Sequence, residues 1–222
     1  MRQRVFAVVL TLLFTACGPT IQGYPLRGPR PHESRHVAEL LDPLLMTLEL
    51  PSLRIIAASN DCKIGFAIAR TDRVNVWSSP ATGSPCLYFT LLITEGALKI
   101  PPEQLMATIA HELGHLALHH TPQSDVTTLA VSGEHWHAIQ AQELEADRFA
   151  IALLKRTRTV YHVGSCEAMA TFLRRSVPDW YGTEISTRMT GAVTRRAASA
   201  DAECASLDLS PLPRLTPAAG AP

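Results

Sequence analysis

The sequence predicts an α+β domain in which a small β-sheet comes before a set of helices. Two observations lead to this fold class. Residues 53–93 contain short runs rich in β-branched and aromatic residues, separated by turn sequences, as is typical of strands. The chain beyond residue 101 instead carries apolar residues at helical spacing. A chain of 222 residues is long enough for one such domain with a hydrophobic core.

The composition is that of a globular protein without a preference for polyanions. Hydrophobic residues make up 46% of the chain and charged residues 18%, which is typical of a folded domain. The 20 acidic and 20 basic residues balance, so no strong field attracts a polyanion. No basic run is interleaved with aromatic residues, and we therefore expect no nucleic-acid partner.

The N-terminus has the pattern of an export signal. A basic start, MRQR, precedes the apolar run VFAVVLTLLF, which is too short to span a bilayer. The small residues that end at Cys17 resemble a bacterial lipobox, although Phe14 replaces the usual leucine. We predict a signal peptide over residues 1–16 and lipidation of Cys17; an ordinary export signal with an incidental cysteine is the alternative. Gly18 favours the outer membrane, so the expected location is periplasmic and lipid-anchored.

The remaining chain divides into a tether, one domain and a tail. Residues 17–31 contain four prolines and three glycines and predict a flexible tether. The domain is expected over residues 32–204. Residues 205–222 are rich in proline and alanine and predict a disordered tail.

Within the domain, we expect helices on both sides of the strands. The first helix starts at His32, and Pro43 predicts a kink or a restart capped by Asp42. Strands are expected in the runs LRIIAA, IGFAIA, VNVW and CLYFTLLI, the last turning helical near residues 90–96. A proline pair then opens a helix that ends near residue 120. Further helices are expected at 134–157, 165–176 and 184–199.

Four cysteines lie beyond the lipidation site. An even number in an exported chain predicts disulfides, because the periplasm is oxidising. Of the three pairings, we favour the local ones, Cys62–Cys86 and Cys166–Cys204. Free buried thiols are the alternative.

A histidine-rich segment, AHELGHLALHH at residues 110–120, lies in the second half of the helix that follows the proline pair. Its motif HELGH places His111 and His115 one turn apart on one helical face, where two imidazoles can bind a single Zn²⁺. Glu112 between them can act as general base on a zinc-bound water. The motif predicts one catalytic zinc ion per chain; a surface helix with histidines by chance is the alternative.

Two more histidines follow the motif. His119 lies four residues beyond His115 and therefore on nearly the same face, which makes a second metal conceivable. We expect instead that His119 and His120 are solvated or capping residues at the end of the helix.

A catalytic zinc needs a third protein ligand, and the next helix offers carboxylates. In AQELEADRFA, Glu143 and Asp147 are four residues apart and share a face, whereas Glu145 points well away from them. One carboxylate can bind the metal while the other accepts a hydrogen bond from a metal-binding histidine. A solvated helix face is the alternative.

Together, the two motifs resemble those of the HtpX-like and CAAX-prenyl-protease-type zinc peptidases, gluzincins that combine HExxH with ExxAD. The segment ELEAD, residues 143–147, matches the second motif, and the resemblance covers residues 53–155. It implies a zincin-like fold in which a sheet packs on the HExxH helix and a ligand helix crosses it. It also implies Glu143 as third zinc ligand and Asp147 as supporting carboxylate. No later apolar run could span a membrane, so the resemblance points to soluble, lipid-anchored relatives.

One element of that family is altered here. The family carries a HPxxxxRI-like stretch after the second helix, which supplies a group that stabilises an oxyanion. The nearest match, YGTEISTRM, keeps Arg188 but lacks the His-Pro pair. Arg188, Tyr181 and His162 are therefore the candidates for this role.

These patterns predict a zinc-dependent endopeptidase of the bacterial envelope with Glu112 as general base. The resemblance implies unfolded or misassembled envelope proteins as substrates. We expect the peptide to bind as an added strand, with Arg73–Trp77 as the candidate sheet edge. Two alternatives remain: a zinc-containing binding or chaperone-like lipoprotein with weak or latent protease activity, and a structural envelope protein without metal.

Overall fold

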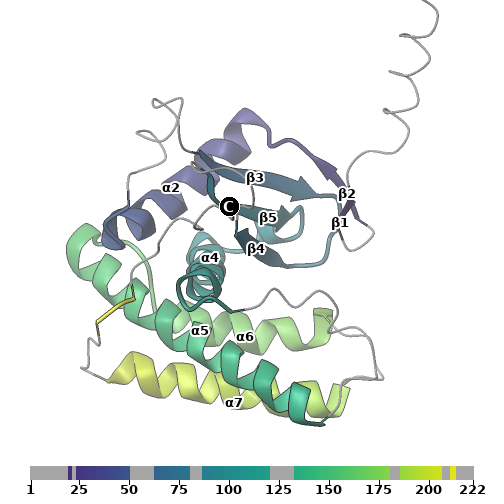
Figure 1. The fold of residues 1–222 in the computed structure, drawn as a ribbon, viewed down its shortest axis with the longest axis vertical. Helices are drawn as coiled ribbons and strands as arrows, with labels where there is room; N and C mark the ends of the chain where they lie inside the picture. The colour runs from purple at the N-terminus through teal and green to yellow at the C-terminus, as the bar shows by residue number, and fades with distance from the viewer. Residues whose placement is uncertain are drawn as a thin grey trace, which may run out of the picture.

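The computed structural model confirms the α+β class and describes residues 20–21, 24–50, 63–80, 87–120, 133–180, 186–206 and 211–213. Figure 1 shows a sheet on one side of helix α4 and a layer formed by α5, α6 and α7 on the other. None of the described helices is long and apolar enough to cross a membrane. Cys17, the predicted lipidation site, and the predicted leader lie outside the described residues, as does most of the predicted tail.

The sheet has the strand order β1-β2-β3-β5-β4. Strand β3 pairs in parallel with β5, and every other neighbouring pair is antiparallel. Strand β5 remains extended to its end and only then gives way to the 3-10 turn η1 (Ala97–Lys99), so the predicted helical turn near 90–96 is wrong. The run LRIIAA lies outside the described residues. The strands are β1 (Thr20–Ile21), β2 (Tyr24–Arg27), β3 (Lys63–Ala69), β4 (Val76–Pro80) and β5 (Leu87–Thr94).

Strand β2 corrects the prediction of a tether over residues 17–31. Its backbone pairs with β3, and the guanidinium of Arg27 donates to both carboxylate oxygens of Glu33 at 2.7 Å and to Glu95 at 2.8 Å. Glu33 also accepts the backbone N–H of Arg30 at 2.7 Å, which caps the helix that follows. Proline and glycine content suggests flexibility, but strand pairing and this ion-pair cluster join residues 24–30 to the domain.

The helices begin and end close to the predicted positions. Helix α2 continues through Pro43 without a restart at Asp42, because it buries a continuous apolar face against the domain. Helix α5 extends four residues beyond its predicted end. The helices are α2 (Pro31–Thr47), α4 (Pro102–Ala117), α5 (Gly133–Tyr161), α6 (Glu167–Trp180) and α7 (Ser186–Ala205).

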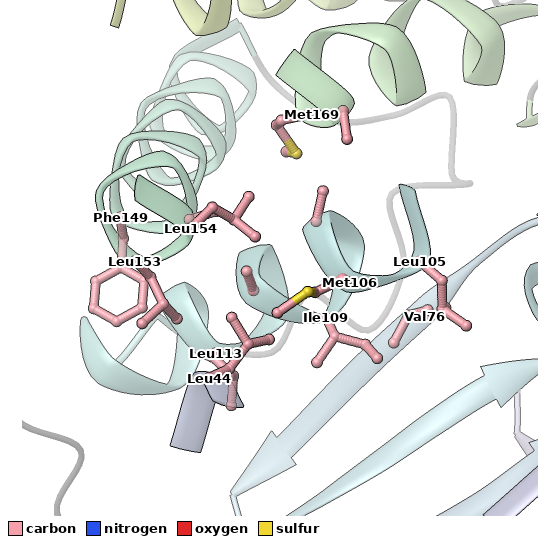
Figure 2. Packing of buried hydrophobic residues seen from close by; sticks show 14 of the residues in the cluster. Leu44, Val76, Leu105, Met106, Ile109, Leu113, Phe149, Leu153, Leu154 and Met169 are labelled. Atoms are coloured by element: carbon pink, nitrogen blue, oxygen red, sulfur yellow. The ribbon is translucent and has the colours of Figure 1, made fainter. Parts of the chain in front are cut away.

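Helix α4 is the centre of the hydrophobic core. Figure 2 shows Leu105 and Ile109 of α4 on the side of the sheet, close to Val76 of β4, while Leu154 of α5 and Met169 of α6 approach from the helical layer. All five side chains are buried. Because α4 is covered from both sides, its backbone has little freedom to shift, and it can hold polar side chains at defined positions.

The predicted disulfide between Cys166 and Cys204 is confirmed, with a Cα–Cα distance of 5.6 Å. It joins the residue before α6 to the last turn of α7. The other predicted pair, Cys62–Cys86, lies outside the described residues.

Removal of this bridge should destabilise the helical layer. For a sequence separation of 38 residues, the chain-entropy relation gives about 4 kcal/mol of stabilisation. We expect the double variant Cys166→Ala/Cys204→Ala to lose about 2–4 kcal/mol in the free energy of unfolding, measured by urea denaturation. The oxidised and thiol-reduced wild type provide the control pair. An unchanged midpoint would contradict a stabilising role for the bridge.

The Arg27–Glu33 pair should make stability depend on acid pH. The hydrogen bonds from Arg27 lower the pKa of Glu33 from 4.5 to about 2. Its ionised form therefore stabilises the fold above pH 4.5, and this contribution is lost as the pH falls towards 2. We expect Glu33→Gln to be less stable than wild type near pH 7, with a difference that shrinks between pH 4.5 and 2 in thermal melts. Glu39→Gln, at an exposed position of the same helix, is the control; a pH-independent difference would contradict the assignment.

Candidate metal centre

The two histidines of HELGH converge as their helical spacing predicts. Helix α4 begins at Pro102, with Pro101 as its N-cap, and carries the motif in its second half. The Nε2 atoms of His111 and His115 lie 3.0 Å apart. His111 is buried and His115 is half-buried, so the pair lies at the edge of the core where a small ion can reach both nitrogens.

Helix α5 brings Glu143 to the same point. One carboxylate oxygen lies 3.4 Å from Nε2 of His111, and the other lies 3.5 Å from Nε2 of His115. Ligands about 2.0–2.1 Å from a tetrahedral zinc are separated from one another by about 3.4 Å. The two distances to Glu143 agree with that value, and the two imidazole nitrogens, 3.0 Å apart, are slightly closer. Two imidazoles with one carboxylate are a zinc-type donor set. The three residues therefore fit a single zinc ion.

Close contact between the two helices depends on Gly114 of the motif. A Cβ atom at this position would lie 2.9 Å from the carbonyl oxygen of Ala146 and 3.1 Å from its Cα. These are backbone atoms of α5 and could give way only if the helix moved. The absence of a side chain at residue 114 thus lets α5 approach α4 closely enough for Glu143 to reach the histidines.

Asp147, one turn beyond Glu143, supports the other ring nitrogen of His111. Its Oδ1 lies 2.9 Å from His111 Nδ1, and the carboxylate is buried. Nδ1 lies near this oxygen but is not aligned for a hydrogen bond with any described residue. A proton on Nδ1 directed at Asp147 would leave Nε2 with its lone pair for a metal. Residues 143 and 147 therefore lie on one face, as the sequence predicts, with Glu143 beside both histidines and Asp147 beside His111.

Arg196 of α7 completes the site and was missed in the sequence analysis. Its Nε and Nη2 donate to Asp147 at 2.7 and 2.8 Å, and Nη1 lies 2.8 Å from Glu143. Burial by itself would raise the pKa of both carboxyls, but Arg196 and His111 hold both below their ordinary values. The predicted candidate Arg188 lies two turns earlier in the same helix, and no local pattern distinguishes the arginines of this segment.

Glu112 is held by the edge strand of the sheet. Its Oε2 accepts the backbone N–H of Ser78 at 2.8 Å and the Ser78 hydroxyl at 2.9 Å. The same hydroxyl lies 3.1 Å from the carbonyl oxygen of Glu112. Ser78 belongs to β4, so this strand fixes the carboxylate beside the two histidines. The sequence contained no signal for this contact.

Burial and neighbouring charges together set the protonation of the site. Burial by itself would lower the pKa of His111, but Asp147 and Glu143 outweigh it and raise this pKa to about 10, so a metal at Nε2 has to displace a proton. Burial raises the pKa of Glu112 to about 7, although His111 and Ser78 act in the opposite direction. A carboxylate with a pKa near neutrality can both accept and return a proton. Burial and the neighbouring His111 lower the pKa of His115 to about 3, so this imidazole is neutral and can offer a lone pair.

Of the three oxyanion candidates, His162 is the one whose side chain the structure describes, and it lies away from this site. His162 lines a hollow of 640 Å³ with Pro102 and Glu103, at the opposite end of α4. Nine residues of helix, or about 13 Å, separate Pro102 from His111. Tyr181 and the side chain of Arg188 lie outside the described part of the chain.

A comparison with protein families found a match that covers the candidate site. The peptidase M78 model, described as the IrrE N-terminal-like domain, matches residues 97–160. That range includes HELGH, Glu143 and Asp147, although it is less than half of the chain. The match supports similarity to a zinc-metallopeptidase-like family, but not to the HtpX-like or CAAX-type peptidases in particular. Comparisons with curated proteins and with solved structures found no match.

The close approach at Gly114 leads to a direct prediction. Gly114→Ala should separate α5 from α4, lower the free energy of unfolding by about 1–3 kcal/mol and reduce zinc affinity. Urea denaturation and zinc titration against a competing chelator measure these effects. Gly191→Ala in α7 is the control, because its Cβ would meet nothing closer than 3.5 Å. Equal zinc affinity of wild type and Gly114→Ala would show that the glycine does not set the helix spacing.

Proposed function

We propose that this protein is a zinc-dependent endopeptidase that acts on extended peptide segments. The observation that carries the proposal is the convergence of His111, His115 and Glu143 beside Glu112, whose carboxylate is held by an edge strand. The family match over this region supports a metallopeptidase-like domain. The same site without a family match would support only metal binding.

In this proposal, each residue of the site has its own role in amide hydrolysis. When bound, zinc supplies Lewis acidity that polarises a carbonyl and acidifies water. Glu112 is placed to accept a proton from the attacking water and to return it to the leaving amine. Ser78 keeps the carboxylate in place. Asp147 orients His111, and Arg196 neutralises the charge that the two carboxylates bring into the core.

Strand β4 supports an added-strand mode of substrate binding. It lies at the end of the strand order, and it contains Val76 and Trp77 of the stretch predicted as the edge. Residues 76, 78 and 80 alternate along this strand. The N–H of Val76 donates to the Asn75 side chain and that of Ser78 donates to Glu112, whereas Pro80 has no N–H group. Since alternate residues of an edge strand face outwards, a substrate strand here would mainly donate its own N–H groups to β4 carbonyls.

The cellular setting is part of the proposal. The export signal and the lipobox-like Cys17 support a periplasmic protein anchored by lipid, with envelope proteins as substrates. Unfolded chains suit the site because an added strand requires an extended peptide.

Cleavage of unfolded casein tests the peptidase assignment. We expect Glu112→Gln to lower kcat/KM by about 100-fold to 10,000-fold while the variant retains zinc, because only the general base is removed. The zinc content is measured on the same samples. Glu103→Gln, at an exposed position in the first turn of the same helix, is the matched control.

The outcomes separate the alternatives. Equal cleavage by wild type and Glu112→Gln would contradict the proposed chemistry. A wild type that binds zinc and cleaves nothing would favour a zinc-containing binding protein instead. A wild type that binds no zinc would favour a structural protein.

A further inference from the structure

His115 has a second partner that the site described above does not use. Its Nδ1 lies 3.0 Å from Nδ1 of His120, and Nε2 of His120 lies 3.1 Å from Oε2 of Glu145. The side chain of His120 is only 6% exposed, whereas that of Glu145 is 58% exposed. The three side chains thus form a chain of hydrogen bonds from the metal centre to the surface.

The backbone after α4 is shaped to place His120 in this position. Helix α4 ends at Ala117, and His119 takes a left-handed conformation with a φ of 54°. The chain turns back there, and the N–H of His120 donates to the carbonyl oxygen of His115 at 2.9 Å. His119 is exposed, and the backbone N–H groups of both histidines cap the end of α4, as expected. The side chain of His120, however, is largely buried rather than solvated.

The order of donors along this chain determines the tautomer of His115. The contact with a carboxylate oxygen makes Nε2 of His120 the donor to Glu145. In the tautomer with its proton on Nε2, His120 offers Nδ1 as an acceptor, and His115 donates from its own Nδ1. The proton of His115 is therefore on the nitrogen that faces away from His111, and its Nε2 keeps a free lone pair at the metal centre.

We propose that His120 and Glu145 are positioning residues that fix the tautomer and ring orientation of His115 as a metal ligand. The inference rests on the proposed function in one respect, namely that His115 binds zinc. It gives each histidine its own carboxylate: Asp147 contacts His111 directly, and Glu145 contacts His115 through His120. Glu145 points away from the shared face of Glu143 and Asp147, and His120 bridges that separation.

Zinc affinity of the full chain tests this inference. His120→Phe keeps an aromatic ring but offers no acceptor, and we expect it to weaken zinc binding by about 10-fold to 100-fold, the range for lost supporting partners. His120→Asn restores an acceptor oxygen near the position of Nδ1 and should recover most of the affinity. Glu145→Gln should weaken binding less, because the exposed amide still accepts through oxygen. Chelator competition measures zinc affinity, and the Co²⁺ absorption spectrum reports ligand geometry.

A control and a further variant complete the experiment. His119→Asn changes the neighbouring exposed histidine to a residue that tolerates a positive φ, and it should bind zinc like wild type. The exposed Glu145 can be replaced without disturbing the core, so Glu145→Ala tests the series of hydrogen bonds even if His120→Phe does not fold. Glu145→Ala should weaken zinc binding more than Glu145→Gln.

The inference and the proposed function fail in different ways. If wild type binds zinc and loses cleavage on Glu112→Gln, but His120→Phe and Glu145→Ala bind zinc as wild type does, only the positioning role is overturned. If His120→Asn is as weak as His120→Phe, the acceptor argument is overturned. If wild type has no zinc affinity, both proposals are overturned.

Discussion

The close contact between α4 and α5 at Gly114 is the constraint on which the candidate site depends. The two histidines belong to one helix and the carboxylates to another, so neither helix contains the site alone. Backbone-to-backbone contact at Gly114 brings residues 143 and 147 within reach of His111. A larger side chain at this contact would push the two helices apart, because the distance between packed helix axes depends on the side chains between them.

Burial of this polar cluster is tolerated because its charges are paired. Glu143 and Asp147 are two carboxylates at the base of the site, and uncompensated burial of either would cost several kcal/mol. Arg196 reaches both from α7, so the helical layer supplies the counter-charge. The disulfide between Cys166 and Cys204 ties the end of α7 to the start of α6 and so restrains the layer that positions this arginine.

The sheet contributes to chemistry as well as to the core. Strand β4 packs on α4 through the buried Val76, and two residues later Ser78 binds Glu112. The same strand therefore positions the candidate general base and forms the proposed substrate edge. In the proposed function, this arrangement would bring an extended peptide to the carboxylate of Glu112 without a separate element for each task.

The sequence by itself determined those features that depend on local periodicity. The spacing of HELGH predicts two imidazoles on one face, the spacing of Glu143 and Asp147 predicts a shared face, and short β-rich runs before long amphipathic helices predict the fold class. The structure agrees with each of these, because positions i and i+4 are neighbours in any α-helix. Only the tertiary structure decided which distant residues meet the motif. The packing of α7 brings Arg196 to the site, and the register of β4 brings Ser78 there. His120 reaches it because the residue before it is left-handed. Strand β2 likewise joins the sheet by pairing with a strand far away in the sequence. Such contacts depend on how elements far apart in the chain pack, and helical or strand periodicity carries no information about that packing.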